Sequence, residues 1–339
     1  MLNKAIIDLR ILRSNAKLIR KNLNKNTLFN AVVKADAYGH GAEIVANALN
    51  DIVDSFSVAL VEEGVRLRLG GITKDILCFS SCNNEDIEIA IRFNLTLTVT
   101  NKKQVILIEQ YSKKQFKKTK IHVKFNTGMN RQGVDGIQNL EELLQVINRC
   151  DNVVLDGFYS HFAQPENKKS LKSALSKFLL ANNVVKSYNN KVISHISASG
   201  GFLQGAHYDM VRIGLLLYGY TPFNTDKIKV KPIMKIYAPI IERRTIKKGE
   251  SALYGNYQTK KDTDILLVRY GYADGLFRKC VKGTFNNRCM DISAVTDQRA
   301  SKFGYPVMDN ADELAKLYGT ISYEILTKAS MRAEKIYLR

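Results

Sequence analysis

Cysteine and proline are scarce in this 339-residue sequence, and tryptophan is absent. The five cysteines are an odd number and are scattered, which is more typical of a reducing compartment than of a disulfide framework. Cys78 and Cys82 lie close together, but no second cysteine or histidine pair completes a zinc site, so we expect no metal. No apolar run approaches about 18 residues, and the N-terminus has no signal-peptide pattern. We therefore expect a cytoplasmic protein without a membrane partner.

Acidic residues are also few, with 32 Asp and Glu against 51 Lys and Arg, which gives a formal net charge of +19. Such a charge can indicate a nucleic-acid partner. Here the lysines are spread along the chain in short clusters such as Lys113-Lys114, and no nucleic-acid-binding motif accompanies them. We expect no nucleic-acid partner and only a weak attraction for anions.

What the sequence does contain is a regular alternation of β-rich apolar runs and segments of helical periodicity. This alternation predicts a parallel sheet, and eight runs over about 210 residues fit a closed (β/α)8 barrel. An open doubly wound sheet is the alternative, but no Gly-x-Gly-x-x-Gly turn follows an early strand. The predicted strands are 28–34, 55–60, 75–80, 95–100, 120–126, 155–161, 192–197 and 210–218.

The pattern changes after Tyr220. Four of the five prolines follow it, and helical periodicity nearly disappears until Asp312. Three short β-rich runs, 233–241, 264–270 and 332–338, indicate a second domain built mostly from strands. At 339 residues the chain is long enough for two domains.

The stretch 32–41, Val-Val-Lys-Ala-Asp-Ala-Tyr-Gly-His-Gly, places Lys34 at the end of a predicted buried strand and before a turn. Burying an unpaired ammonium is costly, so this side chain must reach a site or the surface. A partly desolvated amine can lose its proton near neutral pH and form a Schiff base with an aldehyde. A lone lysine at a strand end more often only extends to solvent, so the neighbouring motifs must decide.

Eight segments together resemble the alanine racemase family, and they follow one another in family order over nearly the whole chain. They are 32–41, 124–133, 157–163, 210–214, 253–255, 271–275, 289–291 and 321–324. The resemblance implies a fold-type III enzyme dependent on pyridoxal phosphate, with an α/β (β/α)8 barrel followed by a mostly-β C-terminal domain. It places the barrel at residues 9–222 and the second domain at residues 1–8 plus 223–339, with strand 4–8 joining the second domain.

The resemblance also assigns a cofactor and substrate site. Lys34 matches the lysine that binds pyridoxal phosphate covalently, and Lys124 matches a lysine that is carbamylated in many members. Further cofactor-binding residues implied by the resemblance are Tyr38, Arg131, His161, Ser199, Arg212, Gly214, Leu215 and Tyr323, and the substrate-binding residues are Arg131, Met290 and Tyr272. Several of these lie at or just after predicted strand ends, where the active site of a barrel gathers.

The resemblance implies catalysis by Lys34, Tyr254, His161 and Arg212. Lys34 and Tyr254 match two bases on opposite faces of the substrate α-carbon, and His161 and Arg212 match residues that link the cofactor ring nitrogen to the tyrosine. Because the family tyrosine comes from a second subunit, we expect a homodimer with shared active sites. The predicted function is interconversion of L- and D-alanine, which supplies D-alanine for the bacterial cell wall.

Some positions depart from the family pattern. Asn126 stands where aspartate is usual, Asn130 where glycine is common, and Ala198 replaces an asparagine. The region after Asp291 is shorter than usual, and so is the hairpin expected between Arg278 and Cys289. These departures leave two alternatives open: a racemase for serine or a broader set of amino acids, or a non-catalytic protein that binds pyridoxal phosphate.

Overall fold

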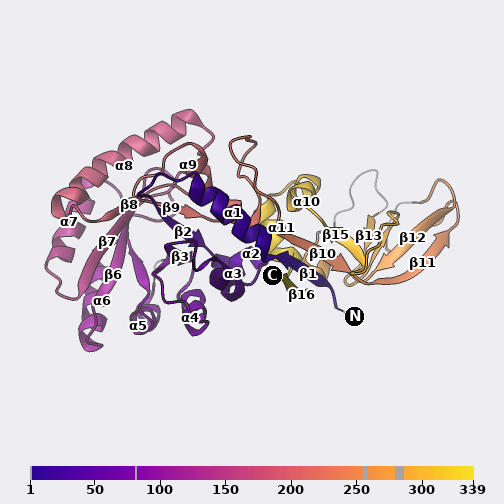
Figure 1. Ribbon diagram of the computed structural model, residues 1–339, viewed down its shortest axis with the longest axis horizontal. Helices are drawn as coiled ribbons and strands as arrows, with labels where there is room; N and C mark the ends of the chain where they lie inside the picture. Colours follow the sequence, from indigo (N-terminus) through magenta and orange to yellow (C-terminus); the bar gives the residue numbers. More distant parts are fainter. Residues whose placement is uncertain (1, 81, 255–257, 279–285) are drawn as a thin grey trace. The chain divides into compact units, whose positions relative to one another are not determined.

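The computed structural model describes residues 2–80, 82–254, 258–278 and 286–339, and these form two compact units (Figure 1). The barrel unit comprises Arg13–Ala35 and Ala42–Val230. The β unit comprises Met1–Leu12, Asp36–Gly41 and Lys231–Arg339. The motif residue Gly255, Cys280 and most of the hairpin predicted between Arg278 and Cys289 lie outside the described residues.

Eight parallel strands form one sheet in the barrel unit, in the order β8-β7-β6-β5-β4-β3-β2-β9. Strands β9 and β8 approach each other at the two ends of this order, where the Asp209 amide donates to the Ser194 carbonyl and the Arg212 amide to the Ser197 carbonyl. The sheet is therefore a nearly closed barrel, as predicted, and the open doubly wound alternative is wrong. The strands are β2 (Leu28–Val32), β3 (Ser55–Val58), β4 (Ile76–Cys78), β5 (Thr96–Val99), β6 (Thr119–Lys124), β7 (Val153–Tyr159), β8 (Ile193–His195) and β9 (Met210–Ile213).

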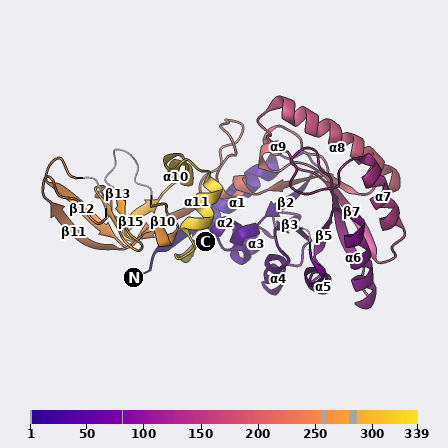
Figure 2. The same ribbon diagram turned by 180° about the vertical axis from the view of Figure 1, so that it is seen from behind.

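Helices surround the strands, as Figures 1 and 2 show for α4 to α8. They bury one apolar stripe each against the sheet. In α7 that stripe is Leu140, Leu143, Leu144 and Ile147, as the periodicity predicts. In α8 it includes Phe178, whereas Leu171 and Leu175 are only half-buried. The helices are α1 (Leu9–Lys21), α2 (Lys34–Gly39), α3 (Ala42–Leu49), α4 (Val61–Leu69), α5 (Asn84–Arg92), α6 (Lys102–Lys114), α7 (Ile137–Asn148), α8 (Lys168–Tyr188) and α9 (Ser199–Leu203).

Two segments differ from the sequence prediction. The last predicted strand, 210–218, is a strand only to Ile213, and the 3-10 helix η1 (Leu215–Tyr218) follows it. The turn predicted after Lys34 is the helix α2, in which four consecutive non-glycine residues, 35–38, have φ between 51° and 55°. Such a left-handed turn costs an L-residue roughly 1–2 kcal/mol, so its surroundings must hold it.

Among its described residues, the β unit contains two four-stranded sheets and the helices α10 and α11, together with most of α2. One sheet has the order β15-β10-β1-β16, in which β1 pairs with β10 and β16 although they are far apart in the sequence. Pro239 separates β10 from β11, so the predicted run 233–241 is divided between two strands. The elements are β1 (Lys4–Asp8), β10 (Met234–Ala238), β11 (Ile240–Ile246), β12 (Thr263–Val268), η2 (Tyr272–Asp274), β13 (Asn286–Arg288), β14 (Ser293–Val295), β15 (Tyr305–Met308), α10 (Ala311–Tyr318), α11 (Ser322–Ala329) and β16 (Glu334–Leu338).

Among the described residues, no helix is both long and apolar enough to cross a membrane. The same residues contain no group of three or more His, Cys, Asp or Glu side chains arranged to hold a metal ion.

Candidate active site

Lys34 follows strand β2 and begins the left-handed turn α2. Burial lowers the pKa of its amine, the positive charge of Arg131 lowers it further, and Glu63 opposes this shift. The Glu63 carboxylate also holds the turn: one oxygen accepts the Ala35 amide at 2.6 Å, and the other accepts the amides of Ala59 and Leu60 at 2.7 and 3.1 Å. The structure thus fixes an amine with a lowered pKa directly before a strained backbone turn.

Lys124, the last residue of β6, is a second buried amine at the same end of the barrel. Burial lowers its pKa to about 8, and the charges of Arg131, Arg212 and Lys34 contribute in that order. These four cations therefore act on one another, and Glu63 is the carboxylate that counters Lys34. A group of four cations, of which Lys124 and Arg212 are buried, with so little negative charge is suited to bind anions.

Arg212, on β9, bonds to protein groups through both of its terminal nitrogens. Its Nη1 donates to Nδ1 of His195 at 2.5 Å, and its Nη2 donates to the carbonyls of Ser160 and Ile196 at 2.8 and 3.2 Å. Nη2 also lies 3.4 Å from Nδ1 of His161. Burial lowers the pKa of His161 to about 3, and the nearby cations, first Arg212, lower it further. At neutral pH His161 is thus a neutral imidazole that accepts from Arg212.

The ring of Tyr159, at the end of β7, lies among these groups. It stacks on His195 with the ring centroids 4.9 Å apart and an interplanar angle of 2°. The Arg212 guanidinium carbon lies 5.1 Å and the Lys124 amine 5.5 Å from the centre of the Tyr159 ring, which are cation–π distances. Tyr159 therefore stabilises two of the cations that have no carboxylate beside them.

Two short helices begin next to this group. Ser199 begins α9 and is buried, and its Oγ accepts the Leu216 amide at 3.5 Å. Gly214 and Leu215 stand at the start of η1. The first amides of a helix have no partner within the helix, so such starts favour bound anions. Ala198, at the N-cap of α9, supplies no side-chain hydrogen bond to that helix start.

The remaining predicted residues belong to the β unit. Tyr38 and Tyr323 are neighbours there, with ring centroids 5.5 Å apart. Tyr272 and Met290 belong to adjoining turns, because the Tyr272 amide donates to the Cys289 carbonyl and the Ala273 amide to the Met290 carbonyl. The side chain of Tyr254 is 82% exposed.

Three residues next to Lys34 and Arg212 are absent from the prediction. They are His195, Tyr159 and Glu63, and none of them is singled out in the sequence analysis. Period-2 alternation along a barrel strand could have indicated the first two, because every second side chain points to the interior. No pattern in the sequence could have indicated Glu63, because its role depends on a turn far from it along the chain.

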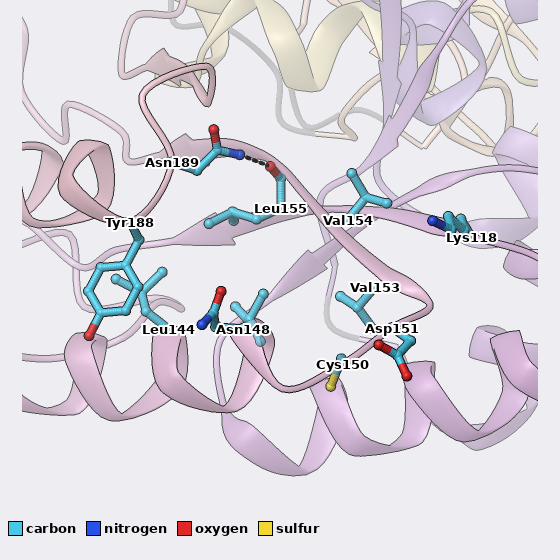
Figure 3. Close-up of a pocket in the computed structure, with 11 residues that line it drawn as sticks. Lys118, Leu144, Asn148, Cys150, Asp151, Val153, Val154, Leu155, Tyr188 and Asn189 are labelled. Carbon is cyan, nitrogen blue, oxygen red and sulfur yellow. Dashed lines mark hydrogen bonds between the residues drawn. The ribbon is translucent and has the colours of Figure 1, made fainter.

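A surface pocket of about 360 Å³ lies away from these residues. It is lined by side chains of α7, α8 and the start of β7, and Figure 3 shows Asn189 donating to the Leu155 carbonyl at its edge. None of the described candidate residues lines this pocket. This pocket is therefore separate from the candidate site at the carboxyl end of the barrel strands.

Comparisons with known proteins agree with this arrangement. Residues 7–222 match the family model "Alanine racemase, N-terminal domain", and residues 233–337 match "Alanine racemase, C-terminal domain". An alanine racemase of Treponema denticola is 33% identical, over 99% of this chain and 98% of the relative. A solved alanine racemase of Clostridium difficile superimposes with a TM-score of 0.92 at 30% identity, over 100% of this chain and 96% of that one. A Bacillus anthracis alanine racemase with bound L-Ala-P gives 0.89 at 26% identity, over 99% and 95%.

Proposed function

The chain belongs to the alanine racemase family, and we propose that it interconverts L- and D-alanine with two bases, Lys34 and Tyr254. Family membership makes it a racemase, a kind of isomerase, and implies pyridoxal phosphate as cofactor. The observation that carries the proposal is the lowered pKa of Lys34, which lies with Lys124, Arg131 and Arg212 at the carboxyl end of the barrel. The D-alanine formed would serve bacterial cell-wall synthesis.

The residues present fit pyridoxal phosphate. Lys34 supplies an amine that would hold the aldehyde, and Ser199, Gly214 and Leu215 offer a hydroxyl and helix-start amides that would hold the phosphate, with Tyr38 and Tyr323 as further hydroxyls. Arg212 would meet the ring nitrogen. The surrounding cations would balance the charges of the phosphate and of the substrate carboxylate. When bound, the cofactor supplies an electron sink for the charge left on the substrate α-carbon.

The protein side chains would then move and hold protons. An amine with a lowered pKa, as in Lys34, spends more time deprotonated near neutral pH and can accept the α-proton on one face. Tyr254 would accept or donate a proton on the other face. Arg212 is a donor that does not lose its proton readily, so it would leave the ring nitrogen unprotonated, which favours racemisation over decarboxylation. Arg131, Met290 and Tyr272 would contact the substrate.

We propose that Lys124 carries a carbamate. An uncharged amine adds to carbon dioxide with release of one proton, and the product is an anion. Lys124 fits this reaction because burial lowers its pKa to about 8, and the anion would lie among Arg131, Arg212 and Lys34. Protein equilibrated with ¹³C-bicarbonate should show a carbamate carbon resonance that Lys124→Arg removes. If the same resonance persists in Lys124→Arg, the modification is elsewhere.

The proposal is tested by exchange of the α-proton of each alanine enantiomer in deuterated water. Wild-type protein should bind pyridoxal phosphate with visible absorption and exchange both enantiomers, and Lys34→Ala should lose both properties. Tyr254→Phe should keep the absorption and exchange one enantiomer only. A colourless wild-type protein that exchanges neither enantiomer would refute the proposal. The ratio of kcat/KM for alanine and serine tests the broader-specificity alternative, which a pocket differing by one hydroxyl discriminates modestly.

The exposed side chain of Tyr254 supports a homodimer in which this residue completes the partner's site. Tyr272 and Met290 are also 39% and 55% exposed in the single chain, which is unusual for groups that meet a substrate. Mixing Lys34→Ala with Tyr254→Phe protein should then restore activity, because each mixed dimer has one site with both bases intact. With random exchange about a quarter of the wild-type activity should return. No recovery after confirmed exchange would refute the shared site.

A further inference from the structure

We infer that His195, His122 and Asp156 form a one-way chain of polar contacts that positions Arg212. Arg212 Nη1 lies 2.5 Å from His195 Nδ1, and His195 Nε2 lies 2.8 Å from His122 Nδ1. His122 Nε2 lies 3.5 Å from Asp156 Oδ2, the longest contact of the three. The functional consequence rests on the proposed function, because there Arg212 meets the cofactor ring nitrogen.

Arginine can only donate hydrogen bonds, and this fixes the direction of every hydrogen bond between Arg212 and Asp156. His195 must accept on Nδ1, so as a neutral ring it carries its proton on Nε2 and donates to His122 Nδ1. By the same argument His122 carries its proton on Nε2 and points it at the Asp156 carboxylate, which only accepts. Protonating either ring would set two donors against each other. The complete burial of His195 and the 4% exposure of His122 also favour neutral rings.

Gly157 and an irregularity in the pairing of β6 with β7 allow the fold to accommodate this row of side chains. A Cβ atom at position 157 would lie 2.4 Å from Nδ1 and Cε1 of His122, so Gly157 is the residue that admits the ring. The pairing of β6 with β7 shifts between Ile121 and His122, which leaves Asp156 as an extra residue opposite no partner. Such a bulge redirects a side chain. The Tyr159 ring then lies flat against His195.

The chain also connects opposite charges across the barrel. The side-chain groups around Arg212 are imidazoles and the Tyr159 ring, and no carboxylate is among its hydrogen-bond partners in the described residues. Asp156 lies at the other end of the chain, where His122 and Asp156 line a cavity of about 200 Å³. Asp54 and Asp75 line the same cavity, and Lys120 contacts Asp75 at 2.8 Å and Asp156 at 3.9 Å. Asp156, His122 and His195 thus act on the reaction through Arg212, as positioning residues.

The first test reads the tautomers directly. In full-length protein with ¹⁵N-labelled histidine, His195 and His122 should both be neutral with the proton on Nε2. Asp156→Ala should shift the Nε2 resonance of His122, which loses its acceptor, while His195 keeps its tautomer because Arg212 fixes it. A wild-type His195 with its proton on Nδ1, or with both nitrogens protonated at neutral pH, would overturn the inference. This reading does not depend on racemase activity, so it separates failure of the chain from failure of the proposed function.

The second test uses kinetics and the absorption of the bound cofactor. Asp156→Ala and Gly157→Ala should each lower kcat about tenfold, the effect of about one hydrogen bond, with KM little changed and with a shifted visible spectrum. Asp156→Asn should recover most of the loss, because its amide oxygen still accepts from His122. Asp75→Asn is the matched control, since it removes a carboxylate at the same end outside the chain, and should change neither quantity. An equal loss in Asp156→Ala and Asp156→Asn, a comparable loss in Asp75→Asn, or a spectrum unchanged in Asp156→Ala would overturn the inference.

Discussion

At the amino end of the barrel strands cations lie beside carboxylates, whereas at the carboxyl end they lie beside one another. Lys120 contacts Asp75 at 2.8 Å, Arg20 contacts Asp54 at 2.7 Å and Lys186 contacts Asp209 at 3.2 Å, all at the amino end. These pairs are partly exposed and balance the charge locally.

The carboxyl end holds Lys34, Lys124, Arg131 and Arg212, with Glu63 as the carboxylate that raises the pKa of Lys34. Burial and mutual repulsion lower the pKa values of both lysines there. An arrangement that costs stability in the protein alone indicates a site that binds an anionic ligand. Cations at the carboxyl end should therefore contribute to ligand binding, whereas those at the amino end should not.

Removing Lys34 should have the largest effect. Lys34→Met should lower kcat/KM by about 100- to 10,000-fold, the range for a positioned base. In the absence of cofactor its free energy of unfolding should equal or exceed that of wild type, because a half-buried cation that lies near other cations is gone. Lys34→Arg should also lose activity but gain no stability, since the charge remains. Denaturant unfolding of the cofactor-free proteins measures this, and a less stable Lys34→Met would contradict unpaired charge at this end.

Lys124 should give a pH-dependent difference in stability. Its pKa is lowered to about 8 in the folded protein from 10.5, so below pH 8 burying the protonated amine costs about 3 kcal/mol. Between pH 8 and 10.5 the unfolded chain binds the proton and the folded chain does not, so this cost disappears as pH rises. Lys124→Met should therefore be more stable than wild type at pH 7, with a margin that shrinks towards pH 10. Unfolding in cofactor-free solution without carbon dioxide measures this difference in the free energy of unfolding. A difference that grows with pH would contradict the lowered pKa of Lys124.

Glu63, at the carboxyl end of the barrel, should contribute both to stability and to the pKa of Lys34. Glu63→Gln replaces one acceptor oxygen with an NH₂ group that faces backbone amides, so we expect a loss of roughly 1–3 kcal/mol of stability. It should also move the pKa of Lys34 further down, because the opposing charge is removed. Glu62→Gln, on the exposed side of α4, is the matched control and should be neutral. Equal effects of the two changes would show that the Glu63 carboxylate does not stabilise the turn after Lys34.

The barrel was predictable because its strands and helices carry the hydrophobic periodicity that each requires. The left-handed turn α2 was not, since Ala35, Asp36, Ala37 and Tyr38 have no intrinsic preference for positive φ and are held there by contacts such as that of Glu63. The end of β9 was also missed. Residues 215–218 are apolar and fully buried, and a buried 3-10 helix and a buried strand look alike in sequence.

Some residues of the candidate site could also be predicted from the sequence, whereas others could not. Lys34, Arg212 and His161 stand in motifs and could be named from the sequence. His195 and His122 have no motif, and a lone histidine is usually structural, so their joint contact with Arg212 became visible only when two strands were placed side by side. Motifs report residues that a ligand meets, whereas supporting residues depend on tertiary contacts.

The smallest effect should come from the paired end. Lys120→Met breaks the contact with Asp75, in which the two side chains are 43% and 55% exposed, so it should cost at most about 1 kcal/mol. The loss should shrink as salt is raised from about 0.05 to 1 M, because solvent-exposed charges are screened, and kcat/KM should stay within about twofold of wild type. Unfolding of cofactor-free Lys120→Met and Lys34→Met at both salt concentrations compares the two ends directly. If Lys120→Met gained stability as Lys34→Met is expected to do, cations at the amino end would be as poorly balanced as those at the carboxyl end, and the charge pattern would no longer mark the binding site.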